Sequence, residues 1–177
     1  MKKILLTLSM TALLLFTAGC SCPFSDKTAD SKPKMNTAAA SAAETAPDFS
    51  YKELGSGKTM RLSDLKGKPV FINFWATWCP PCVGELPHIE KKYAEYKDKM
   101  HFVILSVDDN EQEPARFIQS KGYTFPAAYG DHQALGRAYG IDAIPASYII
   151  SADGRIVAST VGSMNGSSLD AFLQKAF

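Results

Sequence analysis

One short segment limits the possible folds of this chain more than any other: Cys79 and Cys82 are separated by two prolines and lie between a predicted buried strand and a predicted helix. Val70–Trp75 is an almost uninterrupted apolar run, which is typical of a strand covered on both faces. From Pro80 to about Lys97, apolar side chains recur at helical intervals. His101–Val107 is a second apolar run, so the sequence predicts two parallel strands joined by a right-handed helical crossover.

Further segments around this unit predict an α/β fold in which helices flank a central mixed sheet. Upstream, strands at 49–53 and 59–62 enclose Gly55–Ser56–Gly57, a turn signal that predicts an N-terminal β-hairpin. The later patterns predict helices at about 113–121 and 132–139, and strands at about 125–129, 146–151 and 155–161. The last two strands are predicted to form a hairpin, and Ser167 is predicted to cap a final helix.

The N-terminal segment, residues 1–19, is typical of a secretory signal peptide and not of a folded element. Two lysines precede the apolar run Ile4–Phe16, which is shorter than the roughly 20 residues of a membrane-spanning helix. Thr17–Ala18–Gly19–Cys20 resembles a bacterial lipobox, although Thr17 departs from the usual aliphatic residue. We therefore expect acylation of Cys20 and a lipid anchor in a membrane. The alternative is ordinary cleavage nearby and a soluble secreted protein; Cys22 fits no motif.

The 177-residue chain has room for one domain and extra segments. Residues 20–46 are mainly small and polar and cannot bury enough apolar surface to offset the cost of ordering them, so we expect a lipid-anchored flexible tether. Residues 47–177 are expected to form a single domain. The formal net charge of +1 gives no electrostatic reason to expect a nucleic-acid partner. Partners must therefore be selected by shape and chemistry.

The two central cysteines suit thiol–disulfide exchange. Cys79 is predicted just before the helix and Cys82 in its first turn, so the two sulfurs can meet. The N–H groups and the positive dipole end of the helix favour a thiolate at Cys79, which is the attacking species in disulfide exchange. Pro80 and Pro81 fit here because first-turn N–H groups have no helical partner. Cys79 is thus predicted to be the nucleophile, and Cys82 to resolve the mixed disulfide.

Other uses of the cysteine pair are weaker. A structural disulfide that closes so small a loop would stabilise the fold little. A zinc site needs about four ligands, and the histidines at 88, 101 and 132 show no ligand spacing, so we expect no metal. No electron-transfer cofactor is expected either, since the cysteines carry the electrons. Two alternatives stay open: an oxidase that introduces disulfides, and a Cu(I) chaperone that uses the two thiolates as soft ligands. A peroxidase is a third.

Phe74–Cys82, with the sequence FWATWCPPC, resembles the active-site segment of thioredoxins. The lipobox, Glu85–Leu86–Pro87 and the long stretch between residues 108 and 144 are more similar to the TlpA/ResA-like, DsbE-related reductases. The resemblance covers about residues 47–177. It implies a thioredoxin-like fold with a central insertion, and a membrane-anchored thiol–disulfide reductase on the extracytoplasmic or periplasmic side of the cell envelope. It also implies exported disulfide-containing substrates such as apocytochrome c, and a thiol electron donor in the membrane. A monomer is the default expectation.

The resemblance also implies a proton acceptor. Thioredoxins have an acidic residue six positions before the first cysteine, where this chain has Asn73, which cannot titrate. Glu85 lies three residues after Cys82 on the same helix face, and the resemblance implies that it takes the proton from Cys82. The alternative is that Glu85 only complements the helix dipole. Pro87 is expected to interrupt and kink the helix.

The substrate-binding residues are likewise implied by the resemblance. The Ile144–Pro145 peptide bond is expected to be cis and to face the cysteines, with the backbone of Ile144 binding an extended substrate segment. Ala146 stands where family members often have Thr, a departure that affects substrate fit. Trp78, together with Pro80 and Pro81, is expected to form the apolar docking surface beside the nucleophile.

Overall fold

A computed structural model gives the structure of this chain, and it describes residues 44–177. The expected signal peptide, Cys20, Cys22 and most of the expected tether lie outside the described residues. Among residues 44–177, no helix combines the length and the apolar character needed to cross a membrane.

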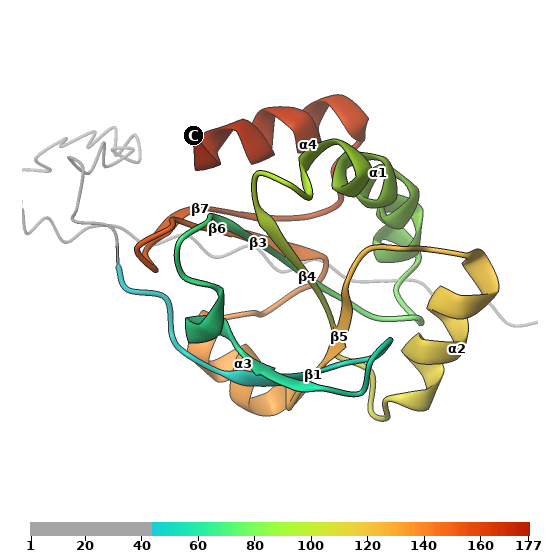
Figure 1. Cartoon of the computed structure of the whole chain (residues 1–177). Coiled ribbons are helices and arrows are strands. Elements are labelled where there is room, and N and C mark those ends of the chain that lie inside the picture. Colours follow the sequence, from blue (N-terminus) through green and yellow to red (C-terminus); the bar gives the residue numbers. More distant parts are fainter. Residues whose placement is uncertain (1–43) are drawn as a thin grey trace, which may run out of the picture. The chain divides into compact units, whose positions relative to one another are not determined.

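A seven-stranded mixed sheet lies at the centre of the domain, with the strand order β2-β1-β5-β4-β3-β6-β7 (Figure 1). The strands are β1 (Ser50–Glu53), β2 (Thr59–Arg61), β3 (Val70–Trp75), β4 (His101–Ser106), β5 (Ala127–Tyr129), β6 (Ala146–Ile150) and β7 (Ile156–Val161). β4 pairs in parallel with β3 and β5, and the remaining pairs are antiparallel. The expected mixed α/β sheet, its N-terminal hairpin and its C-terminal hairpin are therefore confirmed.

Helices cover both faces of this sheet. They are α1 (Pro80–Tyr96), α2 (Gln112–Lys121), α3 (His132–Tyr139) and α4 (Gly166–Leu173), with 3-10 turns at Leu62–Leu65 and Gln174–Ala176. α1, α2 and α4 contribute to one core cluster, while α3 and the first 3-10 turn contribute to the other. α2, β5 and α3 form the expected central insertion between β4 and β6.

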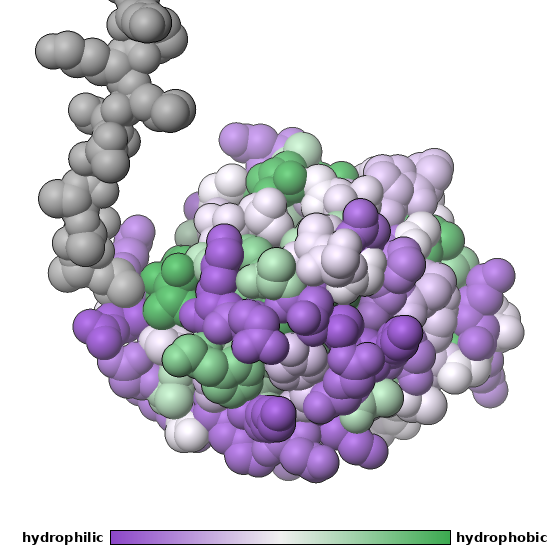
Figure 2. Space-filling model, turned by 90° about the horizontal axis from the view of Figure 1, so that it is seen from above, coloured by the Kyte–Doolittle hydropathy of each residue, from purple (hydrophilic) through white to green (hydrophobic). Residues whose placement is uncertain are grey.

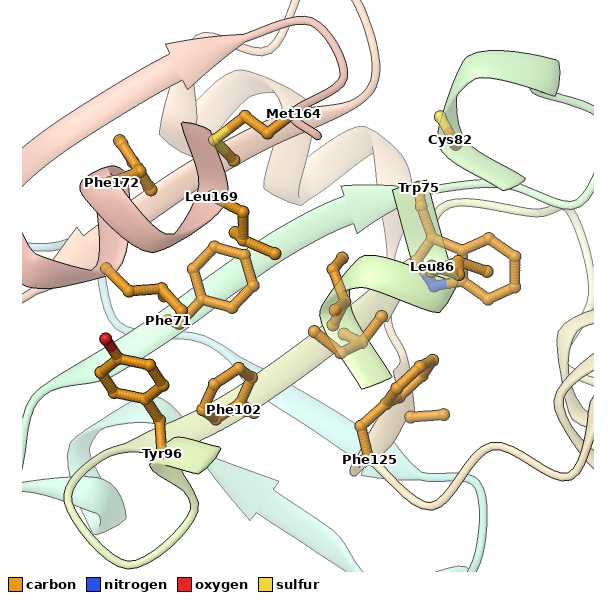
Figure 3. Packing of buried hydrophobic residues seen from close by; sticks show 14 of the residues in the cluster. Phe71, Trp75, Cys82, Leu86, Tyr96, Phe102, Phe125, Met164, Leu169 and Phe172 are labelled. Atoms are coloured by element: carbon orange, nitrogen blue, oxygen red, sulfur yellow. The ribbon is translucent and has the colours of Figure 1, made fainter. Parts of the chain in front are cut away.

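Alternate side chains of β3 enter these two clusters. Phe71 and Trp75 lie in the cluster under α1 and α4, where Figure 3 shows them with Leu86 and Phe172. Ile72 enters the cluster on the α3 side. Burial on both faces explains why β3 is apolar throughout instead of alternating. The outer surface seen in Figure 2 is largely hydrophilic, with separate small hydrophobic patches.

Three local expectations differ from the structure. The domain begins before residue 47, because Thr45 pairs with Arg155 and the Ala46 N–H donates to Gly154 O at 2.9 Å. Asn165, not Ser167, caps α4, and its Oδ1 accepts from two N–H groups of the first turn. α1 is also continuous through Pro87, which lies inside the helix and does not divide it.

Candidate active site

Cys79 and Cys82 form a disulfide at the N-terminus of α1, with an S–S distance of 2.09 Å. Cys79 is the N-cap residue, and its Sγ accepts the Cys82 N–H at 3.3 Å. Pro80 and Pro81 occupy the first helical positions and are exposed. The sulfur of Cys79 therefore lies where the free N–H groups and the positive end of the helix dipole stabilise a thiolate once the disulfide is reduced. Cys82 is the more deeply buried of the pair, with 1% of its surface exposed against 5% for Cys79.

The Ile144–Pro145 peptide bond is cis and faces the nucleophile, as expected. The Sγ of Cys79 lies 3.8 Å from the carbonyl oxygen of Ile144. On the other side, the carbonyl of Pro145 accepts the Gly162 N–H at 2.8 Å, which ties the loop to the end of β7. An extended chain that lies along Ile144 would therefore pass directly beside the reactive sulfur.

A hollow of about 560 Å³ opens beside this pair. Its lining is mostly apolar, and His132 and Asp142 contribute the two polar side chains. The full set of lining residues is Trp78, Cys79, Pro80, Val107, His132, Gly136, Ile141, Asp142, Ala143 and Ile144. Trp78 is 64% exposed and is free to contact a bound chain. Of the expected substrate-binding residues, Trp78, Pro80 and Ile144 thus line one hollow; Pro81 and Pro145 are not among its lining residues.

Glu85 is buried, with 1% of its surface exposed. Its Oε1 accepts the Met164 N–H at 3.0 Å, and its Oε2 accepts from Asn73 Nδ2 at 3.3 Å. Burial raises the pKa of Glu85 from 4.5 to about 7, and these two hydrogen bonds only partly oppose that rise. A carboxyl group with a pKa near neutrality can both take up and release a proton under physiological conditions.

Asp108 is a site residue that the sequence analysis did not identify. It is fully buried, and it accepts hydrogen bonds from the N–H and the Oγ1 of Thr77 and from Ser106 Oγ. Thr77 lies two positions before Cys79, so Asp108 fixes the loop that leads into the redox pair to the end of β4. An acidic residue directly after a buried parallel strand, beside the strand that leads to the cysteines, was the available signal.

No group of three or more His, Cys, Asp or Glu side chains suitable for holding a metal ion lies in the part of the chain that the structure describes. The chemical groups gathered at the N-terminus of α1 are a pair of disulfide-bonded cysteines, a buried carboxyl group and an exposed apolar surface. Together they can exchange disulfides and accept the proton that this exchange releases.

Comparison with known proteins identifies the family. The model of the Redoxin family matches residues 41–173. The chain belongs to the Redoxin family. One relative, the thiol-disulfide oxidoreductase ResA of Bacillus thuringiensis, is 37% identical over 131 residues, which cover 73% of this chain and 75% of the relative.

Two solved structures support the same assignment. A thiol:disulfide interchange protein from Chlorobium tepidum superimposes with a TM-score of 0.68 at 28% identity, covering 78% of this chain and 99% of that one. The pneumococcal exposed lipoprotein thioredoxin Etrx1 of Streptococcus pneumoniae gives a TM-score of 0.65 at 27% identity, covering 73% and 99%. This Redoxin family member therefore has the thioredoxin-like fold and is a thiol–disulfide oxidoreductase of the ResA type.

Proposed function

We propose that this protein is a lipid-anchored, extracytoplasmic reductase of disulfides in exported proteins. One observation supports it most: Cys79 lies at a helix N-terminus beside the cis Ile144–Pro145 bond, while the buried carboxyl of Glu85 lies one turn beyond Cys82. The attacking sulfur, the substrate-binding backbone and a proton acceptor thus lie around the start of one helix.

The reaction is proposed in two exchanges. The Cys79 thiolate attacks one sulfur of the substrate disulfide; a Cys79–substrate bond forms, and the other substrate sulfur leaves as a thiolate. Glu85 then takes the proton of Cys82, whose thiolate attacks the Cys79 sulfur. The Cys79–Cys82 disulfide forms and the second substrate thiolate is released. The substrate has gained the electron pair that the enzyme has lost.

The proposed location follows from the N-terminal sequence. Cys20, in its lipobox-like segment, would carry the acyl chains that anchor the protein in the cell envelope. The similarity to a protein described as an exposed lipoprotein supports this anchor. Compartments outside the cytoplasm are oxidising, so a reductase there needs a supply of electrons. We assign that supply to a thiol donor in the membrane, with no bound cofactor.

The proposed substrates are exported proteins that present a disulfide in an extended segment, such as apocytochrome c. The hollow beside Cys79 supports this class, because its lining is mostly apolar and Trp78 at its edge is exposed. A monomer is sufficient, since one chain contributes both cysteines, Glu85 and the Ile144–Pro145 loop.

The reduction potential of the Cys79–Cys82 pair tests the direction of the reaction. The full chain is equilibrated with mixtures of reduced and oxidised dithiothreitol or glutathione, and the fraction of disulfide is measured. A potential near or below that of thioredoxin, about −270 mV, is expected for a reductase. A potential near about −120 mV, as in strong oxidants, would instead support a protein that introduces disulfides.

A further inference from the structure

Three buried polar side chains form a hydrogen-bond network between α1 and the sheet. Asn73 on β3 directs its Nδ2 toward Glu85 Oε2 at 3.3 Å and toward Ser147 Oγ on β6 at 3.0 Å. All three residues are 1% exposed or less. The Oδ1 of Asn73 is buried and has no hydrogen-bond partner among residues 44–177. A buried carbonyl oxygen without a partner is costly, so this amide needs an explanation beyond packing.

The observed orientation suits an ionised Glu85. A carboxylate only accepts hydrogen bonds, and the Nδ2 group of Asn73 donates to it. A protonated Glu85 has an O–H that must find an acceptor, whereas the Met164 group that faces its other oxygen is an N–H donor. Asn73 Oδ1 is a buried acceptor that has no other partner among the described residues. A half-turn of the carboxamide exchanges Nδ2 and Oδ1, and Oδ1 then faces Glu85.

Ser147 can follow this exchange. Its hydroxyl accepts from Nδ2 in the observed arrangement, and the same hydroxyl can donate to Oδ1 after the half-turn, because a hydroxyl is both donor and acceptor. Neither Asn73 nor Ser147 titrates, so neither competes with Glu85 for the proton. Within one turn of Glu85 on α1, the other titratable side chains are Cys82, three residues before it, and the exposed His88, three residues after it.

We propose that Asn73 and Ser147 form a reversible hydrogen-bond partner for both protonation states of Glu85. The Asn73 carboxamide turns over when Glu85 takes the proton of Cys82, and turns back when Glu85 releases it. Asn73 is then a positioning residue: it donates to the carboxylate and accepts from the acid. This inference rests on the proposed role of Glu85 as the proton acceptor.

The test is an infrared pH titration of the full chain, in which the carbonyl stretch of protonated Glu85 is the band that Glu85→Gln removes. In Asn73→Ala and in the bulkier Asn73→Leu, this band should move to higher frequency, because the acid loses its acceptor. The pKa of Glu85 should also rise by about one unit. Each variant loses the hydrogen bond from Asn73 to the ionised carboxylate and the hydrogen bond from the protonated acid to Asn73, and the bond to the charged form is the stronger. The second variant keeps the test available if the cavity in the first one prevents folding.

Tyr148→Phe is the matched control. Tyr148 is the next residue on β6, belongs to the core cluster on the other face of the sheet, and donates a buried hydrogen bond to Tyr139 O at 2.7 Å. Its removal should leave both the band and the pKa of Glu85 unchanged.

The infrared band separates this inference from the proposed function. A band that stays at its original frequency in both Asn73 variants overturns the inference, because protonated Glu85 then does not donate to Asn73. A band that moves, together with an unchanged pH profile for the attack of Cys82, keeps Asn73 as the hydrogen-bond partner of both protonation states of Glu85, but it overturns the link between the turn of Asn73 and the proton of Cys82 and removes Glu85 from the proposed mechanism.

Discussion

Glu85 and Met164 lie 79 residues apart in the chain, and the Met164 N–H donates to Glu85 Oε1 at 3.0 Å. The bond joins α1 to the connection between β7 and α4, on the same side of the sheet as Cys82. It is one of only two hydrogen bonds that oppose the effect of burial on the pKa of Glu85. The carboxyl group therefore stays near the midpoint of its titration at neutral pH.

This raised pKa makes the stability of the oxidised protein depend on pH. The folded protein holds the Glu85 proton up to a pKa of about 7, against 4.5 for an ordinary carboxyl, so it binds more protons than the unfolded chain between these values. The contribution of Glu85 to the free energy of unfolding is therefore fully present below pH 4.5 and is lost as the pH rises through 7. From pH 4.5 to above pH 7, the free energy of unfolding of the wild type should fall by roughly 3 kcal/mol more than that of Glu85→Gln. Denaturant unfolding at a series of pH values measures both; parallel curves would contradict the raised pKa.

Glu85→Gln should also slow the second exchange. Glutamine cannot accept the proton of Cys82, and general-base catalysis contributes on the order of 100-fold or more. Stopped-flow measurement of thiol release from a preformed Cys79 mixed disulfide isolates this step. Glu95→Gln is the control, because Glu95 lies on the same helix, pairs only with Lys92 and is exposed. Equal rates for wild type and Glu85→Gln across the pH range would exclude the proposed proton transfer.

Much of the fold could be predicted because its strongest patterns are local. Burial of β3 and β4 on both faces produces the continuous apolar runs, and the helical spacing after Cys79 is that of α1. The cap of α4 could not be predicted in this way. Both Asn165 and Ser167 are residue types that favour the N-cap position. Asp170 lies three residues after Ser167, but its carboxylate accepts a hydrogen bond from Lys92, 78 residues away in the chain.

The same distinction between local patterns and long-range contacts applies to the site. The cysteines and the Ile144–Pro145 loop have recognisable sequence signals, and the structure places them together. The burial of Glu85 depends on distant packing, and its partner at Met164 is a backbone N–H, a group that nearly every residue has. The anchoring role of Asp108 depends on Thr77, 31 residues earlier, and no local pattern links the two.

Loss of the Thr77–Asp108 contact should destabilise the protein. Thr77→Val removes a hydroxyl that donates to the buried carboxylate at 2.6 Å, and a hydrogen bond to a charged group contributes about 2 kcal/mol. The free energy of unfolding should fall by about that amount in denaturant titrations. Thr124→Val is the control: its hydroxyl donates to Glu90 at the same distance but on the surface, so its loss should cost less than about 1 kcal/mol. Similar losses in the two variants would argue against a special role for Asp108.

Cys20→Ser should release the protein from membranes. Serine cannot form the thioether to the lipid, and the processing that depends on the cysteine should also stop. Fractionation of cells that express each variant, with antibody detection, measures the distribution. Cys22→Ser is the control, since Cys22 lies outside the lipobox-like segment. Membrane attachment that survives a carbonate wash in Cys20→Ser would mean that another segment anchors the chain.

Trp78→Ala should separate substrate binding from redox chemistry. Trp78 is 64% exposed, so its removal should change the free energy of unfolding by less than about 0.5 kcal/mol. Reduction of an unfolded, disulfide-containing protein should slow, because a large apolar contact beside Cys79 is lost, while reduction of a small aromatic disulfide should be much less affected.

The control for this last change is Phe177→Ala. Phe177 is exposed to a similar degree, 66%, but it stacks on Tyr96 at the C-terminal end of α1, the end opposite Cys79. A helix of this length places the two aromatic side chains roughly 25 Å apart. Only Trp78→Ala should lower kcat/KM for the protein substrate. If both variants, or neither, slow its reduction, the hollow beside Cys79 is not where the substrate docks.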